Sequence, residues 1–183
     1  MPLLSRYERK DSFHRRAKRE GFRSRAAYKL QEIDERYRLL RRGAHVVDLG
    51  CWPGGWLQVA AAAVGPGGRV VGVDLAALDP LPDPQVVVIE ADLAEPGVAE
   101  RILEALGGPT DVVLCDAAPK LTGIRDRDRA QEEELLLVVE GLVPQLLRLR
   151  GDLLVKVLES PEARAVERRL GARFERAKAL RPA

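Results

Sequence analysis

Four acidic residues stand at or just after the ends of short apolar runs, where a sheet would bring them to one edge. They are Asp48, Asp74, Asp92 and Asp116. Ligands of parallel α/β sheets bind beyond the carboxyl ends of the strands, so we expect these carboxylates to line one site. A carboxylate that ends the second strand can accept hydrogen bonds from both hydroxyls of a ribose, and Asp74 holds that place. The pattern predicts a ligand that contains a nucleoside.

The first of these carboxylates opens a glycine-rich turn, DLGCWPGGW over residues 48–56. Gly50 permits a tight turn, and Gly54 and Gly55 let a ligand approach the backbone where the next helix begins. An acid at this turn repels a pyrophosphate but suits a cationic sulfonium and ammonium. The sequence therefore favours S-adenosylmethionine over a dinucleotide. Trp56 is predicted to be either a contact for that cofactor or a packing residue.

A lysine interrupts the apolar run DLLVKVL over residues 152–158. A charge inside a buried strand destabilises the fold unless it is paired, and Asp116 ends the neighbouring predicted strand. We therefore predict that Lys156 pairs with Asp116 and that it is retained for chemistry. Lys29 lies on a predicted amphipathic helix, where a lysine usually belongs to a solvated face.

Helical and strand patterns alternate along the chain from residue 24 onward. Apolar residues at spacings of three and four predict a helix from Ser24 to Leu40, capped by Ser24. The remaining predicted strands are 44–49, 69–74, 85–90, 111–116 and 152–158, with a poor sixth at 174–180, and the remaining helices are 56–63, 96–106, 132–149 and 161–170. This order predicts an α/β fold, a doubly wound, Rossmann-like, mostly parallel sheet covered by helices on both faces.

Composition excludes several classes of protein. The longest apolar run, residues 59–64, is far shorter than the roughly 18 residues that a membrane span needs. Two cysteines exclude a disulfide framework and a multi-cysteine zinc site, and no secretory signal is present. We expect a cytoplasmic monomer with no metal and no membrane partner.

Charge is distributed unevenly although the formal net charge is only +2. Residues 1–42 hold 14 basic and 6 acidic side chains, residues 43–163 hold 9 and 20, and residues 164–183 hold 7 and 2. Basic ends around an acidic centre predict that a nucleic acid docks beside the carboxylate site. With only 8 aromatic residues, phosphate-led docking of folded RNA fits better than stacking along a single strand.

Four segments carry a resemblance to a known family: SRAAYKL (24–30), DLGCWPGGW (48–56), DAAP (116–119) and VKV (155–157). Together they resemble the FtsJ/RrmJ family of ribosomal RNA 2′-O-methyltransferases. The resemblance implies a class I S-adenosylmethionine-dependent methyltransferase domain over residues 24–183, preceded by a basic arm over residues 1–23. It also implies methyl transfer to the ribose 2′-hydroxyl of a nucleotide, a uridine, in RNA of the large ribosomal subunit.

The same resemblance implies roles for individual residues. Lys29, Asp116 and Lys156 match three members of the family's catalytic Lys–Asp–Lys–Glu tetrad. The residues that match its cofactor contacts are Gly54, Trp56, Asp74, Asp92 and Asp116. The tetrad glutamate lies on a final strand beyond the segment that matches residues 174–182, so we expect this chain to be C-terminally truncated relative to the family.

Other functions stay open at this point. One is an RNA-binding member of the same fold with impaired catalysis, and another is a 2′-O-methyltransferase that acts on tRNA. An enzyme that methylates amino groups is less favoured, because DAAPK over residues 116–120 offers no aromatic side chain to hold a planar base.

Overall fold

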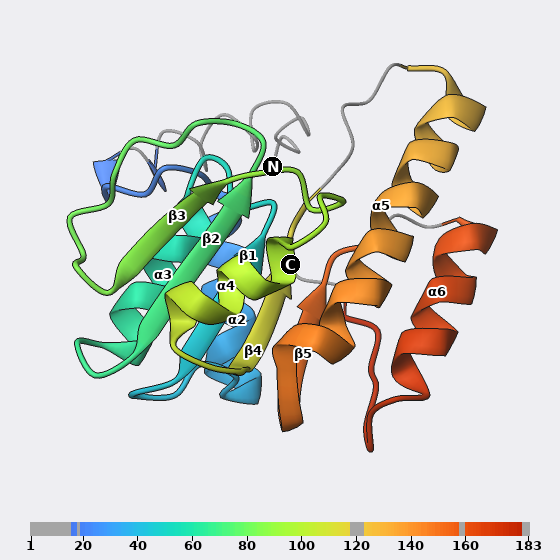
Figure 1. The fold of residues 1–183 in the computed structure, drawn as a ribbon. Coiled ribbons are helices and arrows are strands. Elements are labelled where there is room, and N and C mark those ends of the chain that lie inside the picture. The colour runs from blue at the N-terminus through green and yellow to red at the C-terminus, as the bar shows by residue number, and fades with distance from the viewer. Residues whose placement is uncertain (1–15, 18, 118–122, 158–159, 181–183) are drawn as a thin grey trace.

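The computed structural model describes residues 16–17, 19–117, 123–157 and 160–180. Its centre is a five-stranded sheet of order β3-β2-β1-β4-β5 in which all neighbouring strands run parallel (Figure 1). The strands are β1 (His45–Leu49), β2 (Arg69–Asp74), β3 (Val86–Glu90), β4 (Thr110–Cys115) and β5 (Leu147–Val155). The predicted parallel α/β sheet is therefore confirmed.

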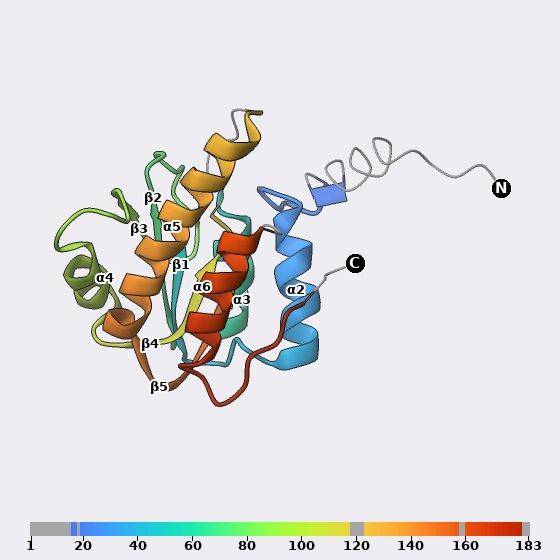
Figure 2. The same ribbon diagram turned by 90° about the vertical axis from the view of Figure 1, so that its right-hand side faces the viewer.

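Helices cover both faces of the sheet, as Figure 2 shows edge-on. One layer consists of α2 (Ala26–Tyr37) and α3 (Gly55–Val64), and the other of α4 (Val98–Leu106), α5 (Arg125–Leu146) and α6 (Pro161–Gly171). Successive strand residues face opposite layers, so Val46 packs in the α2/α3 core and Val47 in the α4/α5/α6 core. This two-sided burial explains why the strands read as continuous apolar runs. None of the helices in the described ranges is long and apolar enough to cross a bilayer.

The first described long helix is shorter than its sequence pattern predicts. Helix α2 has Arg25 at its N-cap without a side-chain hydrogen bond, so the predicted cap at Ser24 is wrong. The helix ends at Tyr37 because Arg38 adopts a left-handed backbone conformation, with φ 55°. The Asp34 carboxylate then accepts a hydrogen bond from the backbone N–H of Leu40, at 2.7 Å, and directs the chain toward β1.

Two predictions near the C-terminal end also fail. Helix α5 begins at Arg125 instead of residue 132 and ends at Leu146, where β5 takes over after an irregular pairing with β4. The predicted sixth strand at 174–180 is wrong, because residues 175–180 have no strand pairing. This segment lacks β-branched residues. It returns to α2, where the Lys178 ammonium lies 5.8 Å from the centre of the Tyr37 ring.

The end of the predicted basic arm packs against the domain. Residues 1–15 and 18 lie outside the described residues. Ala17 is buried, and its carbonyl accepts a hydrogen bond from the backbone N–H of Phe22 at 2.8 Å. On α3, Gln58 donates to the carbonyl of Gly21 at 2.9 Å and accepts from the backbone N–H of Arg23 at 2.8 Å. Residues 21–23 are thereby fixed beside the N-terminal half of α3.

Candidate functional site

The carboxyl ends of β4 and β5 place a lysine against an aspartate. The Lys156 ammonium lies 2.8 Å from Asp116 Oδ1 and donates a hydrogen bond of 2.9 Å to the Asp116 carbonyl. The backbone N–H of Lys156 donates to the Cys115 carbonyl at 2.8 Å, so the two strand ends are held in register. The predicted pairing of Lys156 with Asp116 is confirmed.

The position of Lys156 differs from the prediction in one respect. Strand β5 ends at Val155, so Lys156 follows the strand instead of interrupting it, and its side chain is 33% exposed. Among the described residues, the Lys156 ammonium donates one hydrogen bond, to the Asp116 carbonyl, while its contact with Asp116 Oδ1 is an ion pair. Since an ammonium has three N–H donors, Lys156 retains donor capacity for an oxygen of a ligand within the described part of the chain.

Asp48 is the most deeply buried acid of the described chain. It is 1% exposed, and neither carboxylate oxygen has a hydrogen-bond partner among the described residues. Burial, then the negative charges of Asp116 and Asp74, raise the pKa of this carboxyl well above its usual value. A buried carboxylate without a cationic partner is unstable, and a cationic ligand would relieve this. The site therefore favours a ligand with positive charge.

Asp74 ends β2 with a well-oriented carboxylate. Its Oδ2 accepts a hydrogen bond from the backbone N–H of Trp52 at 2.8 Å, and its Oδ1 accepts one from that of Ala76 at 2.9 Å. A carboxylate offers about four lone-pair positions, so each oxygen can still accept a bond from a hydroxyl of a ligand. The predicted ribose acid is thus fixed in place by the turn after β1.

Glycines shape that turn for steric reasons. Gly50 has φ 77°, and a Cβ there would overlap Ala117 at the end of β4. Gly54 has φ 104° and lies against the side chains of Arg23 and Leu78. At Gly55 a Cβ would overlap the Ser24 hydroxyl, so this glycine permits the segment before α2 to approach α3. Ligand contacts of Gly54 and Gly55 stay predictions.

Three predicted site residues form no hydrogen bond or ion pair with Asp116 or Lys156 in the described structure. Trp56 is 5% exposed, packs between α2 and α3, and donates its indole N–H to the Ala26 carbonyl at 2.9 Å. Asp92 is exposed, and its Oδ1 accepts a bond from the backbone N–H of Ala94 at 2.9 Å. Lys29 is exposed on α2. Their assigned roles stay predictions.

Sequence reasoning missed Arg23. Its guanidinium donates to the carbonyls of Asp79, at 2.6 Å, and Pro80, at 2.8 Å, in the loop that follows β2. It also lies against Gly54, so it connects that loop to the glycine-rich turn. These contacts span more than 50 residues of sequence, and no local pattern signals them.

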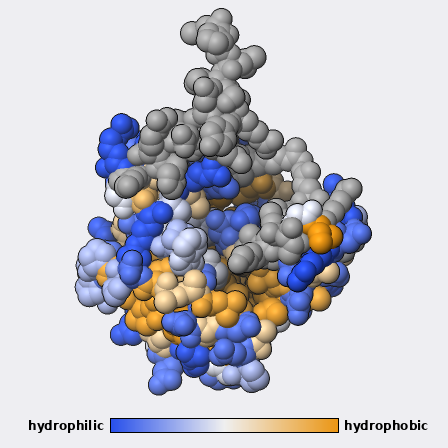
Figure 3. All heavy atoms as spheres, turned by 90° about the horizontal axis from the view of Figure 1, so that it is seen from above, coloured by the Kyte–Doolittle hydropathy of each residue, from blue (hydrophilic) through white to orange (hydrophobic). Residues whose placement is uncertain are grey.

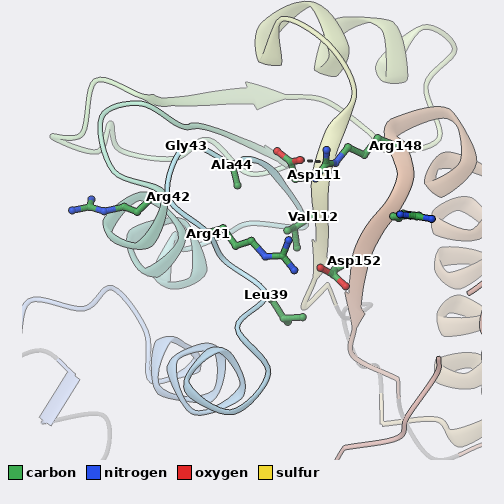
Figure 4. Close-up of a pocket in the computed structure, with 10 residues that line it drawn as sticks. Leu39, Arg41, Arg42, Gly43, Ala44, Asp111, Val112, Arg148 and Asp152 are labelled. Carbon is green, nitrogen blue, oxygen red and sulfur yellow. Dashed lines mark ion pairs between the residues drawn. The ribbon is translucent and has the colours of Figure 1, made fainter. Parts of the chain in front are cut away.

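A cavity of about 180 Å³ lies at the opposite edge of the sheet, where the strands begin (Figure 4). It is lined by arginines and two aspartates. Arg148 lies 2.6 Å from Asp111 Oδ1, while Asp111 Oδ2 accepts a hydrogen bond from the backbone N–H of His45. Because these charges are of both signs and lie far from the strand ends that carry Asp74 and Asp116, the cavity is not part of the candidate site.

The thiols of the two cysteines near the site are unreactive. Cys51 follows β1 and Cys115 ends β4, and both are buried and free of disulfides. Burial raises the pKa of the Cys51 thiol, and it raises that of Cys115 to about 12. Neither residue is therefore a thiolate nucleophile at neutral pH.

The sheet order and the carboxylates at the strand ends define a class I methyltransferase-like fold. A family profile described as FtsJ-like methyltransferase matches residues 22–183, and the chain belongs to this family. The predicted resemblance is therefore confirmed, and with it the dependence on S-adenosylmethionine as methyl donor. The predicted class of enzyme, an RNA methyltransferase, agrees with the names of the relatives.

Relatives and solved structures support this assignment. The chain is 40% identical over 175 residues to a ribosomal RNA large subunit methyltransferase E from Methanothermobacter thermautotrophicus, covering 96% of this chain and 83% of that protein. The ribosomal RNA large subunit methyltransferase E from Pseudomonas aeruginosa is 43% identical over 150 residues, covering 81% of this chain and 72% of that protein. A crystal structure of a ribosomal RNA methyltransferase from Plasmodium falciparum matches with TM-score 0.73 and 28% identity, covering 82% and 86%. Aeropyrum pernix fibrillarin shares the fold alone, with TM-score 0.53 and 17% identity over 73% of this chain and 58% of that one.

The buried charge of Asp48 makes a prediction for stability. Below about pH 3 the Asp48 carboxyl is mostly protonated in both folded and unfolded chains, so Asp48→Asn should leave the free energy of unfolding nearly unchanged. As the pH rises toward the raised folded-state pKa, the unfolded chain ionises first and the wild type loses stability that the variant keeps. We therefore expect the variant to be more stable than the wild type at pH 7. Urea denaturation of both proteins at pH 3 and pH 7 measures this, and a difference in stability between variant and wild type that is the same at both pH values would contradict the buried, proton-binding state of Asp48.

Proposed function

We propose that this protein transfers a methyl group from S-adenosylmethionine to the 2′-hydroxyl of a ribose in large-subunit ribosomal RNA, with a uridine as target. The observation that carries the proposal is the Lys156–Asp116 ion pair, which holds an ammonium beside the carboxylates at the strand ends. The relatives named as ribosomal RNA large subunit methyltransferase E support the choice of RNA.

The proposed division of work follows from what each side chain offers. S-adenosylmethionine supplies an electrophilic methyl group. A ribose hydroxyl is a poor nucleophile, and the Lys156 ammonium would stabilise the negative charge that develops on its oxygen. As that oxygen bonds to the methyl carbon, the methyl–sulfur bond would break with its electron pair on sulfur, and the hydroxyl proton would pass to water. Asp116 holds the Lys156 ammonium in position through two contacts. Lys29 is proposed as a second cation that contacts the reacting ribose once RNA is bound, because it is exposed to solvent on α2.

The residues at the strand ends fit the cofactor by charge and by hydrogen bonding. Asp48 is a buried carboxylate without a partner in the described structure, and it suits a ligand that carries a sulfonium and an ammonium. Asp74 has acceptor positions left for ribose hydroxyls. Gly50, Gly54, Gly55, Trp56 and Asp92 complete the proposed set of cofactor contacts.

The direct test is methyl transfer from isotopically labelled S-adenosylmethionine to total RNA from cells that lack the activity. After digestion of the large-subunit RNA to nucleosides, the label should be found on 2′-O-methyluridine. Label on tRNA would redirect the substrate while preserving the chemistry. Label on a base would refute ribose methylation, and binding of RNA without any transfer would identify an impaired, RNA-binding member of the family.

The basic N-terminal segment makes a prediction for RNA affinity. Residues 1–15 contain four basic and two acidic side chains. If they contact phosphates, their removal should flatten the slope of log affinity against log salt by up to about three, because fewer counterions are released. Filter binding over 50–300 mM salt measures the slope. Replacing Arg6, Arg9, Lys10 and Arg15 by glutamine in the full chain is the matched control, and an unchanged slope in both would show that the segment makes no phosphate contacts.

A further inference from the structure

One aromatic side chain at the candidate site is left without a partner. Trp52 is 60% exposed, and its indole has no ring, cation or hydrogen-bond partner among the described residues. The other described aromatic residues are packed. Phe22 and Tyr28 contact each other edge to face, and Trp56 and Phe174 pack against the two cores. The Tyr37 ring has the Arg36 guanidinium at 5.5 Å and the Lys178 ammonium at 5.8 Å from its centre.

The backbone holds Trp52 at the tip of a short turn. The backbone N–H of Gly54 donates to the Cys51 carbonyl at 2.7 Å, which makes Trp52 and Pro53 the two corner residues of a β-turn. The backbone N–H of Trp52 is itself bound to the Asp74 carboxylate at 2.8 Å. A corner position that is anchored on both sides turns the side chain away from the core. The exposure of Trp52 thus follows from an ordered turn.

This turn lies on the edge of the sheet that carries the candidate site. Gly50, two residues before Trp52, packs against Ala117, which follows Asp116. Asp74 contacts Trp52 directly. Figure 3 views the molecule from this edge, where hydrophilic and hydrophobic residues both reach the surface. These contacts place Trp52 at the same strand ends as Asp74 and Asp116, where a ligand larger than the cofactor could contact it.

We propose that Trp52 is a stacking platform for one unpaired base of the RNA substrate. A base has an aromatic face, and stacking on an indole removes the apolar surface of both from water. Paired bases of an A-form helix are inaccessible to such a side chain, so the proposal requires an unpaired nucleotide at the site. A single platform agrees with the low aromatic content, because phosphate contacts still supply most of the affinity. The inference rests on the proposed function only in taking RNA as the ligand.

Fluorescence quenching tests the stacking directly in the unmodified protein. The chain has two tryptophans, and Trp56 is 5% exposed, so the neutral quencher acrylamide reaches Trp52 selectively. Single-stranded poly(U), added without cofactor, should abolish most of the quenching, whereas polyphosphate of matched charge should leave it unchanged. Protection by polyphosphate alone would overturn stacking, because phosphate contacts would then suffice. Protection by S-adenosylhomocysteine alone would instead assign Trp52 to the wall of the cofactor site.

Affinities of Trp52 variants show whether the indole ring itself binds RNA or only supports the fold of the turn. Trp52→Ala should weaken poly(U) binding about five- to a hundredfold, and Trp52→Phe should retain most of the affinity. The affinity for S-adenosylhomocysteine should change less than about twofold, because the backbone N–H that binds Asp74 remains. Leu149→Ala is the matched control, since this 94% exposed apolar residue lies at the opposite edge of the sheet. Unchanged poly(U) affinity of Trp52→Ala would overturn the proposal, even if wild-type methyl transfer is established.

Discussion

Lys156→Ala is expected to lower the turnover of methyl transfer by about a hundredfold or more, the usual effect of losing a positioned charge-stabilising group. The reason is local, because Asp116 Oδ1 holds the ammonium at 2.8 Å, at the strand ends where the ribose oxygen is proposed to bind. The fold should survive, since the side chain is one-third exposed and follows β5 instead of crossing the core. Single-turnover assays at saturating cofactor measure the effect on the chemical step.

Two further variants make the Lys156 test specific. Lys156→Arg keeps the charge but should also lose most activity, because a planar fork does not replace a compact ammonium beside one hydroxyl oxygen. Lys178→Ala removes a lysine of the C-terminal segment whose ammonium lies 5.8 Å from the Tyr37 ring of α2, and it should leave turnover near the wild-type rate. If Lys156→Ala methylates RNA at the wild-type rate, the Lys156–Asp116 pair is structural and the reacting hydroxyl lies elsewhere.

The prediction of the fold succeeded where the sequence signal was local. Strands such as β2 are short runs of β-branched residues, and their parallel burial on both faces leaves the same apolar pattern whatever their neighbours are. Boundaries failed where the backbone changed direction for tertiary reasons. The end of α2 depends on Arg38 in a left-handed conformation and on a hydrogen bond to Asp34. The start of β5 depends on an irregular pairing with β4.

Those residues of the candidate site that lie at the carboxyl ends of strands could be predicted from the sequence. Asp74 ends β2 and Asp116 follows β4, the two neighbours of the central strand β1, so the rule for ligand sites in parallel sheets brings them together at the carboxyl ends of the strands. The pairing of Lys156 with Asp116 could be predicted for the same reason. The burial of Trp56 could not, because an aromatic residue at a glycine-rich turn suits either packing or a ligand until its neighbours are known.

Residues that act through the backbone left no signal in the sequence. Arg23 binds carbonyl oxygens of Asp79 and Pro80, and carbonyls are present in every residue of the loop. The contact between Trp52 and Asp74 likewise uses the backbone N–H of Trp52, so the residue type does not reveal it. Such contacts determine how the turn after β1 and the loop after β2 fit together, and they emerge only from the folded chain.

Asp74 gives the second large expected effect, on cofactor affinity. Asp74→Ala should weaken binding of S-adenosylmethionine by roughly tenfold to a few hundredfold, the scale of a charge-assisted hydrogen bond to ribose hydroxyls. Because the ribose is common to substrate and product, binding of S-adenosylhomocysteine should weaken by the same factor. Asp48→Asn should differ, since loss of a carboxylate weakens the sulfonium-bearing S-adenosylmethionine more than its neutral-sulfur product. Isothermal titration calorimetry of both ligands against both variants measures this contrast.

A ligand that lacks the ribose 2′-hydroxyl shows whether Asp74→Ala weakens cofactor binding by losing a direct contact with the ribose or by loosening the turn after β1. Asp74 also holds the backbone N–H groups of Trp52 and Ala76, so Asp74→Ala removes two structural hydrogen bonds along with the proposed ribose contact. The 2′-deoxy analogue of S-adenosylhomocysteine should bind the wild type more weakly than the parent compound, but Asp74→Ala should bind both alike. Such a non-additive cycle arises only if the carboxylate and the hydroxyl interact. Additive losses would mean that Asp74 supports the cofactor site only by holding the turn that carries Trp52.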